Sequence, residues 1–239
     1  MASQISGTAL SRTTVAYEHI KRRIIRLEIL PGAAFTEAQV AAELGLSKTP
    51  VREALAQLRR ERLVEIDFRS GCRAAPVTLK DTMELTAFRG LLEGEAASLA
   101  ASRLADIAHL RALEKLCQSS YHEMDPASVD EFLERNTEFH CTVAHAGGNE
   151  RLASVLEEVL HQLERLFRIG LLYTSRAIEI VHEHEDLLAA IKAGDAEGAR
   201  AVAISQARAS QKMILDGLLS SPEILSARIG SSVAPLVRA

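Results

Sequence analysis

The sequence predicts a mainly α-helical fold, with a small amino-terminal module that contains a short two-stranded hairpin, followed by an antiparallel bundle of about six helices. Three observations indicate this fold. Ala and Leu are abundant, whereas aromatic residues make up only 4% of the 239 residues, and this composition favours helices. From Thr78 onward, apolar residues recur at spacings of three and four, with no convincing strand pattern. Glycine, Asn and Asp residues separate these periodic segments, as expected at helix ends.

The amino-terminal module is predicted to open with a helix that begins at Thr13 or Thr14. Its apolar side chains repeat at helical spacing, namely Tyr17, Ile20, Ile24 and Leu27. The segment 29–32 contains Pro and Gly and ends this helix. Residues 1–11 are small, polar and aperiodic, so we expect a loose tail there.

Two short helices joined by a tight turn are predicted next. Residues 37–44 form the first, and Gly45 stands where a left-handed residue ends a helix. Ser47 is expected to cap the second helix with its hydroxyl, and Pro50 falls in the first turn, where its missing N–H costs nothing. The buried stripe of the second helix consists of Val51, Leu55 and Leu58. This order of elements predicts a helix-turn-helix.

The second helix of this pair exposes a basic, hydrogen-bonding surface in its first turns, made of Lys48, Thr49 and Arg52. Two strands are predicted to follow, over residues 63–66 and 72–77, with a glycine tip at Gly71. The amino-terminal module is therefore expected to be a winged helix-turn-helix.

Charge is distributed unevenly along the chain. Residues 1–76 contain 12 Lys and Arg against 8 Asp and Glu, whereas the remainder carries a net charge of −8 with His neutral. A basic head beside an acidic body is typical of a protein whose head binds nucleic acid. No signal peptide or transmembrane run is visible, so we expect a cytoplasmic protein. The widely spaced Cys72, Cys117 and Cys141 are expected to be free thiols.

Six helices with short connections are predicted after Thr78. The first spans 81–103, with Leu85, Leu92, Ala96 and Leu99 on its stripe, and the second spans 106–119. The third runs from 125 to 148, and Asn149 caps the fourth, which carries an apolar stripe from Leu152 to Leu166. The fifth spans 177–193, and Asp195 caps the sixth, which reaches Leu219. A compact antiparallel bundle follows from these lengths and connections, with a poorly ordered tail over 221–239.

Five polar side chains interrupt the apolar stripes of the bundle. They are Arg89 on the first helix, Asn136 and His140 on the third, His184 on the fifth and Gln206 on the sixth. One such residue alone is usually a hydrogen-bonded core group, and Arg89 can also form an exposed pair with Glu93 four residues on. Burying all five without partners would cost about 1–3 kcal/mol each, so a shared polar cavity is the better interpretation. His145, His161 and His182 lie off the stripes.

The winged module resembles the DNA-binding domain of the GntR family of bacterial transcription regulators. The similarity lies in Ser47–Leu55, which departs from the family pattern only at Lys48, and in Pro31–Glu37. Many members have a DNA-contacting Arg after that Glu, where this chain has Ala38. The resemblance implies that Ser47, Lys48, Thr49 and Arg52 meet the major groove of double-stranded DNA, while Arg69, Gly71 and Arg73 face the minor groove from the wing. It also implies a homodimer on a pseudo-palindromic operator.

The bundle resembles the FCD domain, the ligand-binding domain of the FadR subfamily, over about residues 80–220. Matching segments include Phe88-Arg89 and Glu183-His184. In many members an Asp and three His hold a metal, and the corresponding residues here are Asn136, His140, His184 and Gln206. Two imidazoles with oxygen donors suit zinc or nickel, although the two amides are weaker ligands. Arg89 matches the effector-binding arginine, which implies a small organic acid as the ligand.

Together these features predict a DNA-binding transcription regulator, a repressor rather than an enzyme, whose helical domain binds a carboxylate effector. The predicted domains are 12–78 for DNA, 79–220 for effector and dimer contacts, and 221–239 as the tail. Two alternatives stay open. A metal held by His140 and His184 could activate water for hydrolysis, although no inward acid stands out as a general base. The bundle could also be solid, giving a DNA-binding dimer without an effector.

Overall fold

The computed structural model describes residues 11–67, 71–103, 111–112, 115, 126–173 and 177–221. They fall into two compact units that meet in sequence between Pro76 and Val77. Within these ranges no helix is both long and apolar enough to cross a bilayer. Cys72 and Cys141 are free thiols, and Cys117 lies outside the described ranges.

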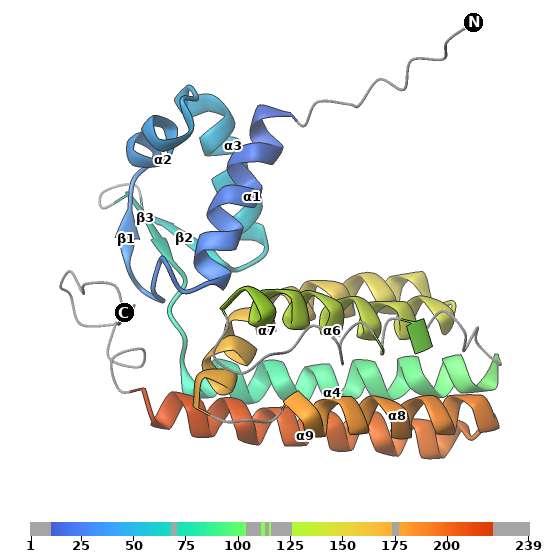
Figure 1. Ribbon diagram of the computed structural model, residues 1–239. Helices are drawn as coiled ribbons and strands as arrows, with labels where there is room; N and C mark the ends of the chain where they lie inside the picture. The colour runs from blue at the N-terminus through green and yellow to red at the C-terminus, as the bar shows by residue number, and fades with distance from the viewer. Residues whose placement is uncertain are drawn as a thin grey trace, which may run out of the picture. The chain divides into compact units, whose positions relative to one another are not determined.

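The first unit contains three helices and a three-stranded sheet (Figure 1). Its elements are α1 (Arg12–Ile25), β1 (Ala34–Phe35), α2 (Glu37–Leu44), α3 (Lys48–Arg60), β2 (Val64–Asp67) and β3 (Gly71–Ala74). The strands are antiparallel in the order β1-β3-β2. Ile20, Ile24, Leu55 and Leu58 lie in one apolar core of this unit. The mainly helical fold with a winged helix-turn-helix is confirmed.

Local capping explains where these helices begin and end, with one correction. Thr36 and Gln39 form a reciprocal capping box at the start of α2, and Gly45 ends α2 with a left-handed φ of 63°. Ser11 caps α1, so that helix begins slightly before the predicted Thr13. Ser47 occupies the N-cap position of α3, but the prediction that its hydroxyl caps the helix is wrong, because it makes no capping hydrogen bond. The Ser47 side chain is exposed.

The wing contains one strand more than predicted. β2 and β3 pair as expected, and Gly71 at the start of β3 has a φ of 87°. The additional β1 pairs with the other edge of β3, where Phe35 is opposite Cys72. A two-residue strand has no periodicity that a sequence pattern could reveal. The predicted wing residue Arg69 lies outside the described residues.

The second unit is a helical bundle built around α4 (Leu79–Ser102). The other described helices are α6 (Pro126–Ala146), α7 (Glu150–Tyr173), α8 (Ala177–Ala193) and α9 (Ala196–Leu219). Helix α4 packs against all four of them, most extensively against α9 (Figure 1). The predicted helix over 106–119 and the predicted tail over 221–239 lie almost wholly outside the described residues.

Asn149 and Asp195 cap α7 and α9 as predicted, whereas the predicted stripe of α4 is right at Ala96 but wrong at its three leucines. Leu85, Leu92 and Leu99 are only half-buried. The buried face of α4 instead carries small and polar residues, including Thr82, Thr86, Arg89, Gly90, Glu93 and Gly94. Small residues are needed there because α9 lies close: a Cβ on Gly94 would come within 3.0 Å of Ile204.

Helix α9 crosses α7 at backbone contact. A Cβ built on Gly217 would lie 2.8 Å from the carbonyl oxygen of Ile169 and 2.9 Å from Cα of Gly170. Backbone atoms cannot move aside as a flexible side chain can. Gly217 is therefore required by packing rather than by backbone conformation.

We expect Gly217→Ala to lower the free energy of unfolding by about 1–3 kcal/mol, because the added methyl forces α7 and α9 apart. Urea unfolding followed by circular dichroism measures this change. At an unstrained helix position the same substitution raises stability, by about 1 kcal/mol. A more stable Gly217→Ala variant would therefore contradict the close crossing.

Candidate functional site

A buried polar cluster occupies the interior of the bundle. Arg89 and Glu93, one turn apart on α4, have exposed fractions of 1% and 3%. Arg89 Nε donates a hydrogen bond of 2.8 Å to Glu93 Oε1. His140 of α6 joins both residues, with Nδ1 3.1 Å from Glu93 Oε1 and Nε2 3.3 Å from Arg89 Nη2. The sequence alternative of an exposed Arg89–Glu93 pair is thus wrong about exposure, although the pair exists.

The second histidine lies beside the first. The ring of His184 on α8 stacks on Phe139 with centroids 4.1 Å apart and stands edge-on to His140 at 5.1 Å. Gln206 of α9 is buried and donates its amide N–H to the carbonyl of Glu183, the residue before His184. Asn136 is buried on α6 one turn before His140. Four helices therefore supply the predicted residues to one region of the bundle.

Several polar atoms in this cluster have no hydrogen-bond partner within the described part of the chain. They are Arg89 Nη1, Glu93 Oε2, Asn136 Oδ1, both ring nitrogens of His184 and Gln206 Oε1. Buried polar groups in native proteins are nearly always hydrogen-bonded, and leaving them unbonded is costly. The arrangement is that of a polar site whose remaining bonds are completed by water or a small ligand.

Burial controls the protonation of this cluster. It lowers the pKa of both His140 and His184 well below the usual range; the positive charge of Arg89 adds to the shift at His140, and the His140 ring and Arg89 add to it at His184. Burial also raises the pKa of Glu93, while Arg89 opposes that rise. The imidazoles are therefore neutral at physiological pH.

The residues present do not fit the divalent metal that the family resemblance implies. The guanidinium of Arg89 lies 3.3 Å from His140 Nε2, which places a positive charge beside the nitrogen a metal would need. Nδ1 of the same ring faces Glu93. Asn136 and Gln206 offer only neutral amide oxygens, and among the described residues no three His, Cys, Asp or Glu side chains are grouped to hold an ion.

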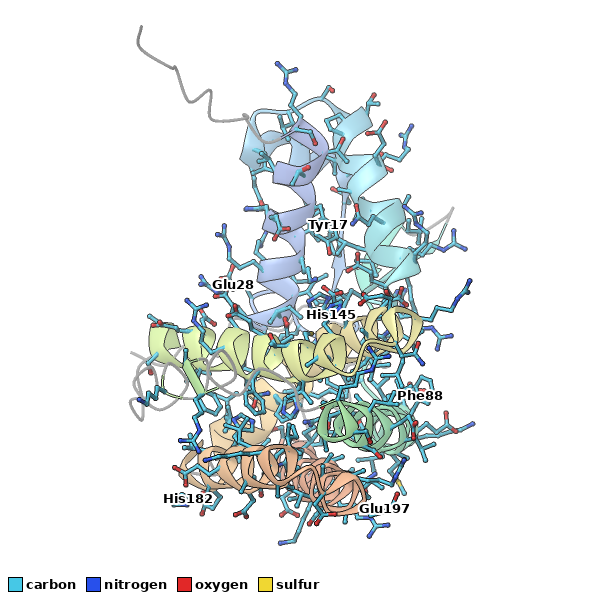
Figure 2. All side chains as sticks on the ribbon, turned by 90° about the vertical axis from the view of Figure 1, so that its right-hand side faces the viewer. Tyr17, Glu28, Phe88, His145, His182 and Glu197 are labelled. Atoms are coloured by element: carbon cyan, nitrogen blue, oxygen red, sulfur yellow. The ribbon has the colours of Figure 1, made fainter. Side chains whose placement is uncertain are left out.

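The sequence analysis missed Glu93 as a member of this site. No inward acid stood out from the sequence as a general base, and the structure shows that Glu93 is an inward acid. The signal was available in the spacing of Arg89 and Glu93, because residues four apart on a helix share a face, so an inward Arg89 implies an inward Glu93. His145 and His182 are exposed, and Figure 2 shows His182 at the edge of the bundle.

A second polar surface lies on the first unit, at the start of α3. Ser47, Lys48 and Thr49 are exposed there. The side chain of Arg52 is 68% exposed and forms a two-pronged pair with Glu37 of α2, at 3.1 and 2.9 Å. These hydrogen bonds lower the pKa of Glu37. On β3, Gly71 is exposed and Arg73 is half-buried.

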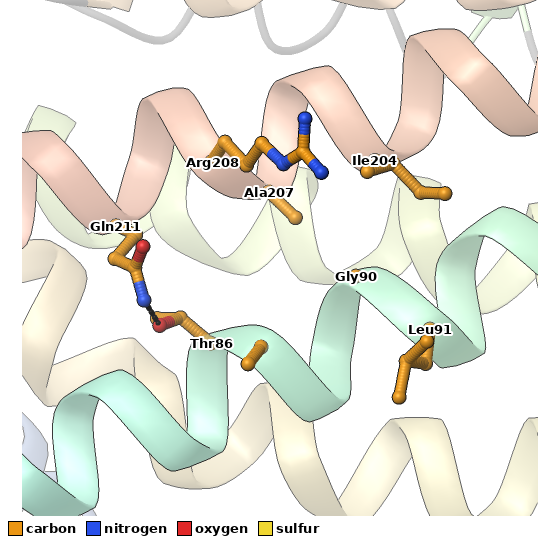
Figure 3. A pocket seen from close by; sticks show the side chains of 8 residues that line it. Thr86, Gly90, Leu91, Ile204, Ala207, Arg208 and Gln211 are labelled. Carbon is orange, nitrogen blue, oxygen red and sulfur yellow. Dashed lines mark hydrogen bonds between the residues drawn. The ribbon is translucent and has the colours of Figure 1, made fainter.

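The outer face of the bundle carries an open groove between α4 and α9, with a volume of about 260 Å³ (Figure 3). It is lined by Thr86, Ala87, Gly90, Leu91, Ile204, Ala207, Arg208 and Gln211. None of the predicted effector residues faces this groove. Four large apolar side chains of α4 are exposed on the outside of the helix, namely Leu79, Met83, Phe88 and Leu91, and Figure 2 shows Phe88 projecting outward.

We expect Glu93→Ala to destabilise the protein by about 3–5 kcal/mol, because it leaves the Arg89 guanidinium buried without its partner. The double substitution Arg89→Met/Glu93→Met should lose less stability than the single one, since it removes both charges. Urea unfolding measures both. The exposed pair of Lys80 and Glu84 has the same spacing on the same helix, so Glu84→Ala is a matched control that should change stability little. Equal losses for Glu84→Ala and Glu93→Ala would contradict the buried pair.

Comparisons with known proteins agree with both units. Residues 12–73 match the model of the bacterial regulatory proteins of the gntR family, and residues 84–207 match the FCD domain. The HTH-type transcriptional regulator YdhC of Bacillus subtilis is 31% identical over 187 residues, covering 77% of this chain and 82% of that protein.

Two further relatives support the same assignment. The HTH-type transcriptional repressor GlaR of Escherichia coli is 28% identical over 222 residues, covering 90% of this chain and 96% of that protein. The solved structure of E. coli McbR/YncC superposes with a TM-score of 0.70 at 25% identity, covering 87% of this chain and 98% of that one. The chain belongs to the GntR family of bacterial transcription regulators and joins a helix-turn-helix domain to an FCD domain.

Proposed function

We propose that this transcription regulator is a repressor that binds its operator through α3 and the wing and responds to a small organic acid held in the bundle. Residues 12–78 bind DNA, and residues 79–220 bind the effector and a second copy of the chain. The observation that carries the proposal is the combination of an exposed basic helix start with a buried polar cluster whose hydrogen bonds are incomplete.

The start of α3 supports major-groove recognition. The Ser47 hydroxyl makes no capping hydrogen bond, so Ser47 and Thr49 can both bind phosphates and base edges. Lys48 supplies a charge, and two hydrogen bonds to the Glu37 carboxylate fix the position of the Arg52 guanidinium. Arginine presented in this way can donate two hydrogen bonds to the O6 and N7 atoms of guanine. Gly71, Arg73 and Arg69 are proposed to face the minor groove from the wing.

We expect Arg52→Ala to weaken operator binding by about tenfold or more at physiological salt, because one good two-pronged base contact provides about 1–3 kcal/mol of discrimination. The probe is a duplex selected from random DNA by the wild-type protein, and binding is measured by fluorescence anisotropy. Arg59→Ala removes an exposed arginine from the last turn of the same helix and is the matched control. An unchanged affinity for Arg52→Ala, with normal circular dichroism, would contradict the proposed role of α3.

The buried cluster supports an effector site. Arg89 Nη1 is a buried donor without a partner in the described structure, and a guanidinium edge of this kind binds a carboxylate. The other effector contacts are assigned to Asn136, His140, His184 and Gln206. Effector binding would then shift the balance between DNA-competent and incompetent states, a coupling that is typically about 1–3 kcal/mol.

The outer face of α4 supports a homodimer. Leu79, Met83, Ala87 and Leu91 repeat at intervals of four and form one exposed stripe. Such a stripe can pack against the same stripe of a second copy across a twofold axis, so that both subunits contribute the same surface patch. Exposed apolar patches of this kind commonly mark protein contacts. A twofold dimer also places two helix-turn-helix domains so that they can bind the two half-sites of an operator in the cytoplasm.

We expect Leu91→Glu to convert the dimer to a monomer and to weaken operator binding, because it places a charge in the middle of the apolar stripe. Light scattering coupled to size-exclusion chromatography measures the mass. Leu172→Glu is the control, since Leu172 is 63% exposed on α7 and Leu91 is 69% exposed on α4. A Leu91→Glu protein that stays dimeric would show that another surface joins the subunits.

Neither alternative from the sequence has equal support. A metal-dependent hydrolase would need an open metal position, whereas both nitrogens of His140 face Glu93 and Arg89. A solid, effector-free bundle would satisfy its own buried polar atoms, whereas six such atoms in the cluster around His140 and His184 have no partner among the described residues. We therefore favour a ligand-responsive regulator over an enzyme.

A further inference from the structure

The cluster atoms that have no hydrogen-bond partner among the described residues include both donors and acceptors, and their types indicate which ligand the site can bind. Three of the unbonded atoms are oxygen acceptors: Glu93 Oε2, Asn136 Oδ1 and Gln206 Oε1. Arg89 Nη1 is a donor, and His184 offers one donor and one acceptor when its ring is neutral. A ligand that completes these bonds must bring hydrogen-bond donors as well as an acid group.

The orientation of the Gln206 amide is set by the structure. Its nitrogen donates to the carbonyl of Glu183. Turning the amide over would place two oxygens against each other, so Gln206 Oε1 must remain an acceptor. Ionised Glu93 Oε2 likewise accepts only. The demand for donors therefore does not depend on how the Asn136 amide is assigned.

The charge of the cluster points to the same ligand chemistry. Arg89 and Glu93 form one buried pair of opposite charges, which leaves no net charge between them. A simple carboxylate would bring a negative charge into this buried region without a matching positive one. Burying an uncompensated charge is costly. A ligand that carries its own positive charge beside the carboxylate avoids that cost.

We propose that the effector is an amino acid or a close analogue, bound as a zwitterion. Its carboxylate accepts from Arg89 Nη1, and its ammonium group donates to Glu93 Oε2 and to the Asn136 and Gln206 oxygens. An ammonium group supplies three donors, which equals the number of unbonded oxygens. A hydroxy acid supplies one donor and keeps its net negative charge. The inference rests on the proposed effector site and names its ligand class.

The test compares acids that differ in one group. Succinate, malate and aspartate share a skeleton and carry hydrogen, hydroxyl or ammonium at the same carbon, as do glutarate, 2-hydroxyglutarate and glutamate, and propionate, lactate and alanine. Each is titrated into the full-length protein by isothermal calorimetry. In the series whose length fits, we expect the amino member to bind about tenfold or more tightly than the unsubstituted acid, because the latter leaves the acceptors unbonded.

Two variants locate the acceptors. Gln206→Met keeps the side-chain length but removes the amide oxygen, so it should reduce the preference for the amino member while changing the affinity of the unsubstituted acid less. Gln211→Met is the matched control, because Gln211 lies five residues further along α9 and lines the outer groove instead. Arg89→Met should abolish binding of every acid in the series.

The outcomes separate the two levels of the proposal. If the unsubstituted or hydroxy acids bind as tightly as the amino acids, the zwitterion inference is overturned and the acid effector stands. If amino acids are preferred but Gln206→Met keeps the full preference, the assignment of the acceptors is overturned. If no acid binds the wild-type protein, both the ligand class and the proposed acid effector fall.

Discussion

The buried pair of Arg89 and Glu93 is the interaction on which the bundle depends most. Both residues lie on α4, the helix that packs against every other described helix of the bundle, so neither charge can reach water. A charge in such a place is tolerated only when it is paired and hydrogen-bonded. His140 contacts both partners and is held in place by them. The residues of the site are thus grouped around the Arg89–Glu93 pair of α4.

Close packing on the other side of α4 is made possible by small residues. Gly90 and Gly94 let α9 approach, and Gly217 lets α9 cross α7 at backbone distance. Because α9 also carries Gln206, these glycines fix how deeply that side chain, a proposed effector contact, enters the bundle. The same helices leave the open groove and the apolar stripe on the outside. Helices α4 and α9 therefore border both the polar cluster inside the bundle and the groove on its outer face.

Two of the arginine–glutamate pairs, Arg52–Glu37 and Arg89–Glu93, lie in different surroundings. Arg52 is exposed and Glu37 is half-buried, and pairs at the surface contribute little to stability. In its proposed role, Arg52 is therefore expected to leave Glu37 for DNA at small cost. Arg89 and Glu93 are buried, so separating them is expensive. A ligand is expected to add to that pair instead of replacing it.

Features determined by local sequence could be predicted from the sequence alone. The glycine ends, the caps at Asn149 and Asp195, the limits of α8 and the inward polar positions of α6, α8 and α9 all follow from neighbours within a turn or two. The family resemblance rests on such local segments, at the start of α3, in Pro31–Glu37 and along the helices of the bundle. Tertiary structure decided the rest. Strand β1 and the buried face of α4 depend on partners far away in the chain. The lack of fit to a metal depends on them too, because Arg89 and His140 meet only when α4 and α6 pack together.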